Sequence, residues 1–270
     1  MWQFLNLLGG TLLLRPYVFI FLGCYLLLAT WQFGIGRTLI FLIAGYLVAW
    51  LAELSSIHTG FPFGLYIYIP ATLDRELWVA GVPFMDSLSY VFLAYASYSM
   101  ALLALGQGRW QGWRFSLKED RTLLNSWGST ILGAVLMMTL DVVIDPVALR
   151  GYRWFLGQIY GYPEPGFYFG IPLSNFAGWL LVALILIRLL QLLLARLPAG
   201  AFWDWGRRDF SGRALLGPGL YLGILAFNLI ITLMIGEPAL FLAGAFIYLP
   251  FLTWLGLKLW RSDAGGKPGI

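Results

Sequence analysis

Two aspartates, Asp141 and Asp145, stand four residues apart in an otherwise apolar segment. In a helix this spacing puts both carboxyl groups on one face. Burial, a neighbouring carboxylate and the negative end of a helix all favour the uncharged acid, and Pro146 predicts that the helix ends at Asp145. An acid that keeps its proton near neutral pH can serve as a general acid. We therefore predict acid chemistry here, with a cap on a neighbouring helix or an ion pair to Arg150 or Arg153 as the structural alternatives.

Other polar side chains are expected near the same membrane face, at the ends of other helices. They are Glu53, His58, Asp86 and Asn175. Ionisable groups at membrane depth are costly and by default suggest function. His58 also fits a structural histidine or one metal ligand, but the chain has no second histidine for a common zinc set. Asp86 fits a first-turn acid that complements a helix dipole, and Asn175 fits either a helix cap or a group that orients a carboxyl.

Two loops between these helices are rich in Gly, Pro and aromatic residues and nearly free of charge, at residues 60–70 and 160–172. Such segments either fold back to line a lipid-like cavity, where irregular backbone is tolerated, or form an aromatic belt at the membrane interface.

Membrane helices must position these groups, because 60% of the 270 residues are hydrophobic and only 11% are charged. Soluble domains carry about 25% charged residues. A bilayer is spanned by about 20 apolar residues, and seven segments qualify. They are residues 16–33, 38–57, 83–105, 124–149, 172–194, 214–235 and 238–258. We predict an all-α polytopic membrane helix bundle, with one domain over residues 1–261 and a disordered tail over 262–270.

The basic residues predict how the bundle sits in the lipid bilayer. Most of the 17 Lys and Arg residues fall on one side of a seven-span topology, which predicts an outside N-terminus and a cytoplasmic C-terminus. The formal net charge of +4 indicates loops that face a membrane surface, so no nucleic-acid partner is expected.

Three motifs stand out: residues 58–64 (HTGFPFG) with Tyr66, residues 141–146 (DVVIDP) and residues 170–179 (GIPLSNFAGW). These motifs and their order resemble those of the family of carotenoid biosynthesis membrane proteins that includes the carotenoid 1,2-hydratases. The resemblance implies cofactor-free addition of water to the terminal C=C of an acyclic carotenoid such as lycopene or γ-carotene in bacteria, or a C50 carotenoid in haloarchaea. The chain has 13 acids against 17 bases and lacks a haloarchaeal acidic excess, which favours a bacterial cell membrane.

With that reaction in view, Asp141 or Asp145 is expected to donate a proton, and the second carboxylate, Glu53 or His58 to take one from water. Aromatic faces of Tyr66, Tyr168 and Trp179 are expected to stabilise the cation, with Asp86 and Asn175 beside the substrate. No metal is expected, and a carotenoid glycosyltransferase is the expected downstream partner. Two rival interpretations are a Mg²⁺-dependent intramembrane prenyltransferase, which the DxxxD spacing suits, and a proton-coupled transporter.

Overall fold

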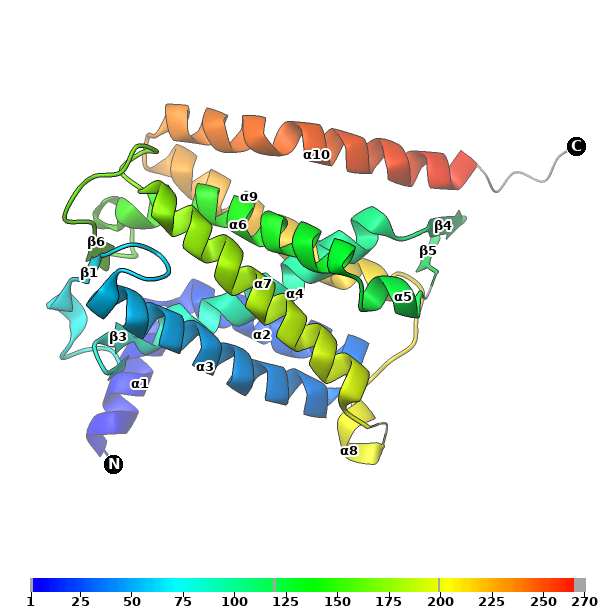
Figure 1. Cartoon of the computed structure of the whole chain (residues 1–270), viewed down its shortest axis with the longest axis horizontal. Coiled ribbons are helices and arrows are strands. Elements are labelled where there is room, and N and C mark those ends of the chain that lie inside the picture. Colours follow the sequence, from blue (N-terminus) through cyan, green and yellow to red (C-terminus); the bar gives the residue numbers. More distant parts are fainter. Residues whose placement is uncertain (1, 119, 199, 265–270) are drawn as a thin grey trace, which may run out of the picture.

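The computed structural model describes residues 2–118, 120–198 and 200–264, and its long apolar helices run side by side in one bundle (Figure 1). The described residues include seven such helices: α2 (Pro16–Phe33), α3 (Ile35–Thr59), α4 (Phe84–Leu105), α6 (Trp127–Leu149), α7 (Leu173–Arg196), α9 (Leu216–Met234) and α10 (Pro238–Ala264). Each is long and apolar enough to cross a bilayer. The fold is therefore an all-α polytopic membrane bundle, which confirms the predicted class and number of spans.

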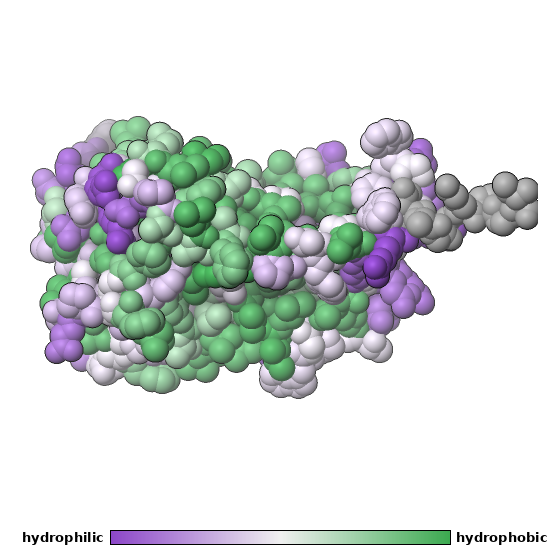
Figure 2. Space-filling view, turned by 90° about the horizontal axis from the view of Figure 1, so that it is seen from above, coloured by the Kyte–Doolittle hydropathy of each residue, from purple (hydrophilic) through white to green (hydrophobic). Residues whose placement is uncertain are grey.

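The hydropathy of the molecular surface is that expected of a protein that spans a bilayer. Hydrophobic residues cover the middle of the face seen in Figure 2, and hydrophilic residues gather toward the two ends. Exposed apolar side chains such as Ile43, Leu51 and Phe246 lie on the outward faces of their helices. In water such a surface would be a liability, whereas lipid chains cover it at no cost.

Helix α4 forms the centre of the bundle, where it packs against α2, α3, α6, α7 and α9. Nearly all of its side chains are buried. Small residues such as Ala94, Ala96, Ser97 and Ala101 allow the neighbouring backbones to approach closely, as in other membrane helix pairs.

Helices α6 and α7 are held in register at the end away from the aromatic loops. The side-chain amide of Gln191 accepts a hydrogen bond from Thr130 at 2.8 Å and donates one to Ser129 at 3.0 Å. Gly133 lets the two helices meet, because a Cβ there would lie 2.8 Å from Ile187 Cδ1. This fixed pairing sets where the opposite ends of α6 and α7 can place their polar groups.

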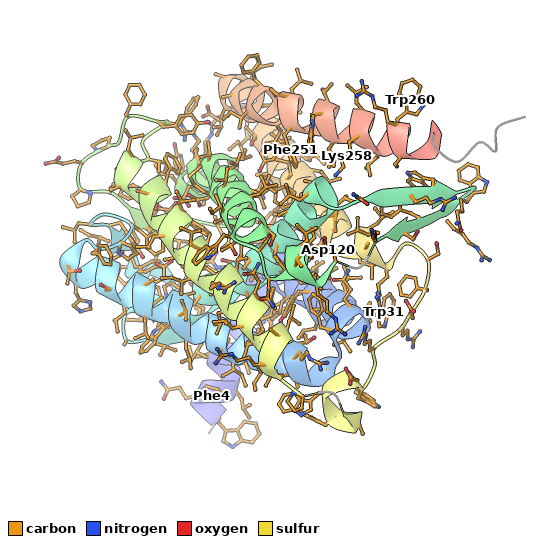
Figure 3. All side chains as sticks on the ribbon, turned by 45° about the vertical axis from the view of Figure 1, so that its right-hand side comes forward. Phe4, Trp31, Asp120, Phe251, Lys258 and Trp260 are labelled. Atoms are coloured by element: carbon orange, nitrogen blue, oxygen red, sulfur yellow. The ribbon has the colours of Figure 1, made fainter. Side chains whose placement is uncertain are left out.

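Short elements make the connections. They are α1 (Trp2–Leu14), β1 (Ile67–Tyr68), η1 (Pro70–Thr72), β2 (Trp78–Val79), β3 (Val82–Pro83), β4 (Gly108–Gln111), β5 (Arg114–Leu117), α5 (Arg121–Leu124), η2 (Gly151–Arg153), β6 (Tyr160–Gly161), α8 (Ala201–Asp204) and η3 (Arg213–Leu215). Strands β2 and β3 pair, as do β4 and β5, and β1 pairs with β6 from a distant loop. Phe4 marks α1 at the edge of the bundle, and Trp260 projects from the far end of α10 (Figure 3).

The helices begin close to the predicted spans, and the main difference lies at the C-terminal end. Helix α10 continues to Ala264, so the predicted disordered tail begins too early, because Ser262 and the two residues after it are helical. The remainder of that predicted tail, residues 265–270, lies outside the described residues.

Candidate functional site

A cavity lies among α2, α3, α4, α6, α7 and α9. Strands β1 and β6 pair at the same end of the bundle (Figure 1). Three of its lining side chains carry carboxyl groups: Glu53 of α3, Asp86 of α4 and Asp145 of α6. The structure therefore brings together acids from three different helices, as the sequence predicts.

Asp141 and Asp145 form one of two polar centres, joined by Asn175 of α7. The Asn175 Nδ2 donates to Asp141 Oδ2 at 3.0 Å and to Asp145 Oδ2 at 2.6 Å. All three side chains are buried. Asp145 lines the cavity, whereas Asp141 lies behind it and outside the lining. Asn175 thus orients a carboxyl pair, which is one of its two predicted roles.

The predicted end of the helix at Asp145 is wrong. Helix α6 contains Pro146 and continues to Leu149. The turn after Pro146 is retained because Val147 is fully buried against Ile231, Ile235 and Leu240 of the neighbouring helices. Tertiary packing here outweighs the local effect of proline. As a result Asp145 lies within the helix, and its side chain keeps the same face as Asp141.

Glu53 is the second polar centre, and three tyrosines surround it. The hydroxyls of Tyr66 and Tyr68 donate to Glu53 Oε2, the latter at 2.7 Å, and the hydroxyl of Tyr90 donates to Oε1. Hydrogen bonds of this kind stabilise a carboxylate. Tyr68 Oη also lies 2.6 Å from Asp86 Oδ2. Asp86 is thus more than a first-turn acid facing a helix dipole.

Aromatic rings beside the two centres complete the cavity wall. Trp179 stacks on Tyr90 with centroids 4.3 Å apart and planes 5° from parallel. Tyr66 makes edge contacts with Tyr160 and Tyr162, at 5.9 Å and 6.1 Å between centroids. The aromatic loops therefore line a cavity, in agreement with the first of their two predicted roles.

Tyr68 is buried and Tyr160 and Tyr162 are half-buried, all three beside carboxyl groups, and this affects their ionisation. Burial raises the pKa of the Tyr68, Tyr160 and Tyr162 phenols well above their usual range, and nearby carboxyl groups raise it further. These phenols therefore remain protonated at neutral pH and act as hydrogen-bond donors.

Two predicted site residues lie elsewhere. His58 is exposed, and its Nδ1 is 2.8 Å from the Leu54 carbonyl of its own helix. Five residues beyond Glu53, it lies about 140° around the helix from it, so it faces away from the cavity. Tyr168 packs against Phe169 and Phe176 and is not among the lining residues. Both assignments to the site are therefore wrong.

The predicted alternative of an ion pair between the aspartates and Arg150 or Arg153 is wrong. Arg150 and Arg153 both pair with Glu237 at the start of α10, the first at 3.2 Å. No ion pair to Asp141 or Asp145 is present among the described residues. The two arginines near η2 therefore hold the start of α10 to the bundle through Glu237. The hydrogen-bond partner that Asp141 and Asp145 share is Asn175.

A buried ion pair holds the loop that precedes α4. Arg15 binds Glu76 through Nε at 3.1 Å and Nη2 at 3.0 Å, and its Nη1 donates to the Leu156 carbonyl. Thr72 adds a hydrogen bond to the same carboxylate. Arg15 is buried, and it ties the start of α2 to the two loops around the cavity.

Sequence reasoning missed Tyr68, Tyr90, Tyr160 and Tyr162. A signal was available, because Tyr66 and Tyr68 alternate, as do Tyr160 and Tyr162, and alternate residues of an extended segment share one face. Tyr90 stands four residues after Asp86, one helical turn away on the same face.

Within the described residues, no group of three or more His, Cys, Asp and Glu side chains could together hold a metal ion. The four acids instead divide into a pair bridged by an amide and a pair bridged by a phenol.

One curated relative, bisanhydrobacterioruberin hydratase of Haloarcula japonica, is 30% identical over 182 residues, which are 65% of this chain and 54% of the relative. The chain thus spans about half the length of that protein. No solved structure matches the chain. The model of the carotenoid biosynthesis protein family matches residues 13–250. Because this match covers most of the sequence, the chain belongs to the carotenoid biosynthesis protein family.

Proposed function

We propose that this protein adds water to the terminal C=C of an acyclic carotenoid end group, without a cofactor, to give a tertiary alcohol. The observation that carries the proposal is the presence of two separate carboxyl centres, Asp141–Asp145 and Glu53, at one aromatic cavity. Hydration through a cation uses an acid to protonate the alkene and a base to accept the proton that water loses, and one cavity here offers both. Membership of the family and the name of the curated relative support the same reaction.

Asp145 is the proposed proton donor, because it is the member of the pair that lines the cavity. Two carboxyl groups that share one amide nitrogen cannot both carry a charge without strong repulsion, and the proton they share belongs to the pair as a whole. Asp145 transfers this proton to C2 of the end group. The π electrons form the new C2–H bond, and C1 becomes a tertiary cation.

Glu53 is the proposed base. Three phenol donors favour its charged form, in contrast to the single amide that serves both aspartates. A water molecule adds through oxygen to C1, and Glu53 takes the proton that this water loses. The product is a neutral alcohol, Asp145 is left without its proton, and Glu53 is left protonated.

Aromatic faces are suited to the intermediate. Tyr66 and Trp179 line the cavity, and a desolvated cation over such a ring gains about 2 kcal/mol or more. This stabilises the tertiary cation until water adds.

The polyene is proposed to leave the polar end of the cavity between α2, α4 and α9. There Phe21 packs against Phe92 at 5.9 Å and against Phe227 at 5.6 Å between ring centroids, and all three line the cavity. This wall offers apolar contact and hardly any hydrogen bonding, which suits a long hydrocarbon. Lycopene or γ-carotene is the proposed substrate, hydrated at one or both ends.

The proposed location is a bacterial cell membrane, with the N-terminus outside and the C-terminus in the cytoplasm. The distribution of Lys and Arg along the chain supports this orientation.

The test is to express the chain in a lycopene-producing bacterium and to analyse the pigments by chromatography and mass spectrometry. We expect products heavier by one or two waters, with one labelled oxygen per hydrated end when cells grow in ¹⁸O water. Cells with an empty vector give the baseline. Lycopene that stays unchanged while the protein is present in the membrane would refute the proposal. Activity that is lost on adding a metal chelator to isolated membranes would favour a Mg²⁺-dependent prenyltransferase instead.

A further inference from the structure

The Tyr68 hydroxyl lies between two carboxyl groups. Its oxygen is 2.7 Å from Glu53 Oε2 and 2.6 Å from Asp86 Oδ2, and both distances are those of hydrogen bonds to a carboxyl oxygen. A phenol has one proton, so it can donate to only one of these groups at a time. The other carboxyl can make its contact only by donating a proton of its own to the phenol oxygen.

The Glu53–Tyr68–Asp86 chain therefore holds one carboxyl proton in either of two arrangements. In the first, Tyr68 donates to Glu53 and Asp86 is protonated. In the second, Tyr68 donates to Asp86 and Glu53 is protonated. The two arrangements differ only by the shift of two protons along two short hydrogen bonds.

We propose that Tyr68 is a proton relay that returns Glu53 to its basic form after each turnover. This inference rests on the proposed function, because that reaction leaves Glu53 with the proton of the attacking water. Asp86 holds the carboxyl proton while Glu53 acts as the base, so Asp86 first releases that proton to water. The proton of Glu53 then passes to the Tyr68 oxygen while the hydroxyl proton of Tyr68 passes to Asp86. Glu53 becomes a carboxylate again, Tyr68 remains a neutral phenol, and Asp86 carries the proton.

The two shifts must occur together, because a Tyr68 phenolate is costly. Burial raises the pKa of Tyr68 well above its usual range, and the carboxyl groups of Asp86 and Glu53 raise it further. A concerted transfer avoids this charge, and the short distances on both sides of the oxygen permit it.

Asp86 can release the proton that it holds before the next one arrives from Tyr68. It is half-buried, lines the cavity and lies in the first turn of α4, next to the loops that close the site. Water in the cavity can therefore accept the proton. Each turnover then consumes one proton at Asp145 and releases one at Asp86, as the overall addition of water requires.

The other two tyrosines at Glu53 provide a matched control. Among the described residues, Glu53 is the hydrogen-bond partner of the Tyr66 and Tyr90 hydroxyls, and neither bridges to a second carboxyl. Tyr90→Phe and Tyr68→Phe each remove one donor from Glu53 and keep the ring, but only Tyr68→Phe breaks the path to Asp86.

The experiment compares two regimes in purified membranes with lycopene in detergent. With enzyme in excess, each site acts once, and the rate reports the chemical step. With substrate in excess, the rate also reports the return of Glu53 to its basic form. For Tyr68→Phe we expect the ratio of the second rate to the first to fall roughly tenfold or more. For Tyr90→Phe both rates should change in proportion.

Asp86→Asn removes the end of the same path and should show the same lowered ratio, with a smaller solvent deuterium effect on the rate in excess substrate. Product formed in the first regime shows that a variant is folded, and if Tyr68→Phe forms none, Asp86→Asn decides. An unchanged ratio in a folded variant overturns the relay while the proposed function stands. If the wild-type chain itself forms no hydrated product, the proposed function fails, and the relay with it.

Discussion

Replacing Asp145 with asparagine removes a proton while leaving the shape of the site almost unchanged. The new amide oxygen can still accept the hydrogen bond that Asn175 Nδ2 makes at 2.6 Å, and the side chains have nearly the same volume. What disappears is the acid that lines the cavity. The comparison with Asp141→Asn is informative, because Asp141 shares the same amide and the same helix face but does not reach the cavity.

The expected loss of rate in each variant follows from the positions of Asp145 and Asp141 relative to the cavity. A positioned general acid contributes roughly 10²- to 10⁴-fold to the rate, which corresponds to about 2.7 to 5.4 kcal/mol of transition-state stabilisation. Asp145→Asn should lose this whole contribution. Asp141→Asn removes only a neighbour of the acid, and an interaction of about 1.4 kcal/mol between the two carboxyls corresponds to a loss of roughly tenfold. The double variant should be no less active than Asp145→Asn alone, because the two residues act as a unit.

The assay measures hydrated carotenoid per amount of membrane protein, with lycopene supplied in detergent and products separated by chromatography. Size-exclusion profiles and thermal midpoints of the detergent-solubilised variants show whether each remains folded. Retention of more than a tenth of wild-type activity by Asp145→Asn would refute the assignment of the acid. A much larger loss for Asp141→Asn than for Asp145→Asn would move the donor to the deeper carboxyl.

Three further predictions concern packing, charge and position. A Cβ at Gly178 would lie 2.6 Å from the Pro62 carbonyl oxygen, so Gly178→Ala should destabilise the protein by about 1–3 kcal/mol, whereas Gly223→Ala, with open space around it, should leave the thermal midpoint unchanged. Arg15→Met leaves Glu76 buried without its partner and should cost about 3–5 kcal/mol; adding Glu76→Leu should recover part of this loss in the same melting assay. His58→Ala changes an exposed side chain, so the rate of hydration should stay within roughly twofold of the wild-type rate; a larger loss would restore His58 to the site.

Most of the fold follows from the sequence because each span is a long apolar run with polar residues at its ends. Lipid requires a helix of about 20 residues wherever such a run occurs, so the number and order of the spanning helices are determined locally. The alternation of sides then places Glu53, Asp86, Asp145 and Asn175 at one end of the bundle, and all four line the cavity.

Rotation of each helix and the course of the loops depend on packing between distant segments. Spacing alone predicts the angle between His58 and Glu53 around α3. It does not predict which side of α3 faces the centre of the bundle. The end of α6 was judged from Pro146, whereas the packing of Val147 against Ile231 and Leu240 determines it. The pairing of Tyr68 with Tyr160 joins loops about ninety residues apart, and no local pattern indicates this partner.

That pairing has a mechanical consequence. Strands β1 and β6 place Tyr68 directly opposite Tyr160; the first tyrosine holds Glu53, and the second lies 3.4 Å from the backbone carbonyl of Asp145. The ribbon formed by β1 and β6 therefore contacts both the Glu53 centre and the helix that carries Asp145. A displacement of this ribbon would move the Tyr68 donor away from Glu53 and the Tyr160 hydroxyl away from the Asp145 carbonyl in the same movement.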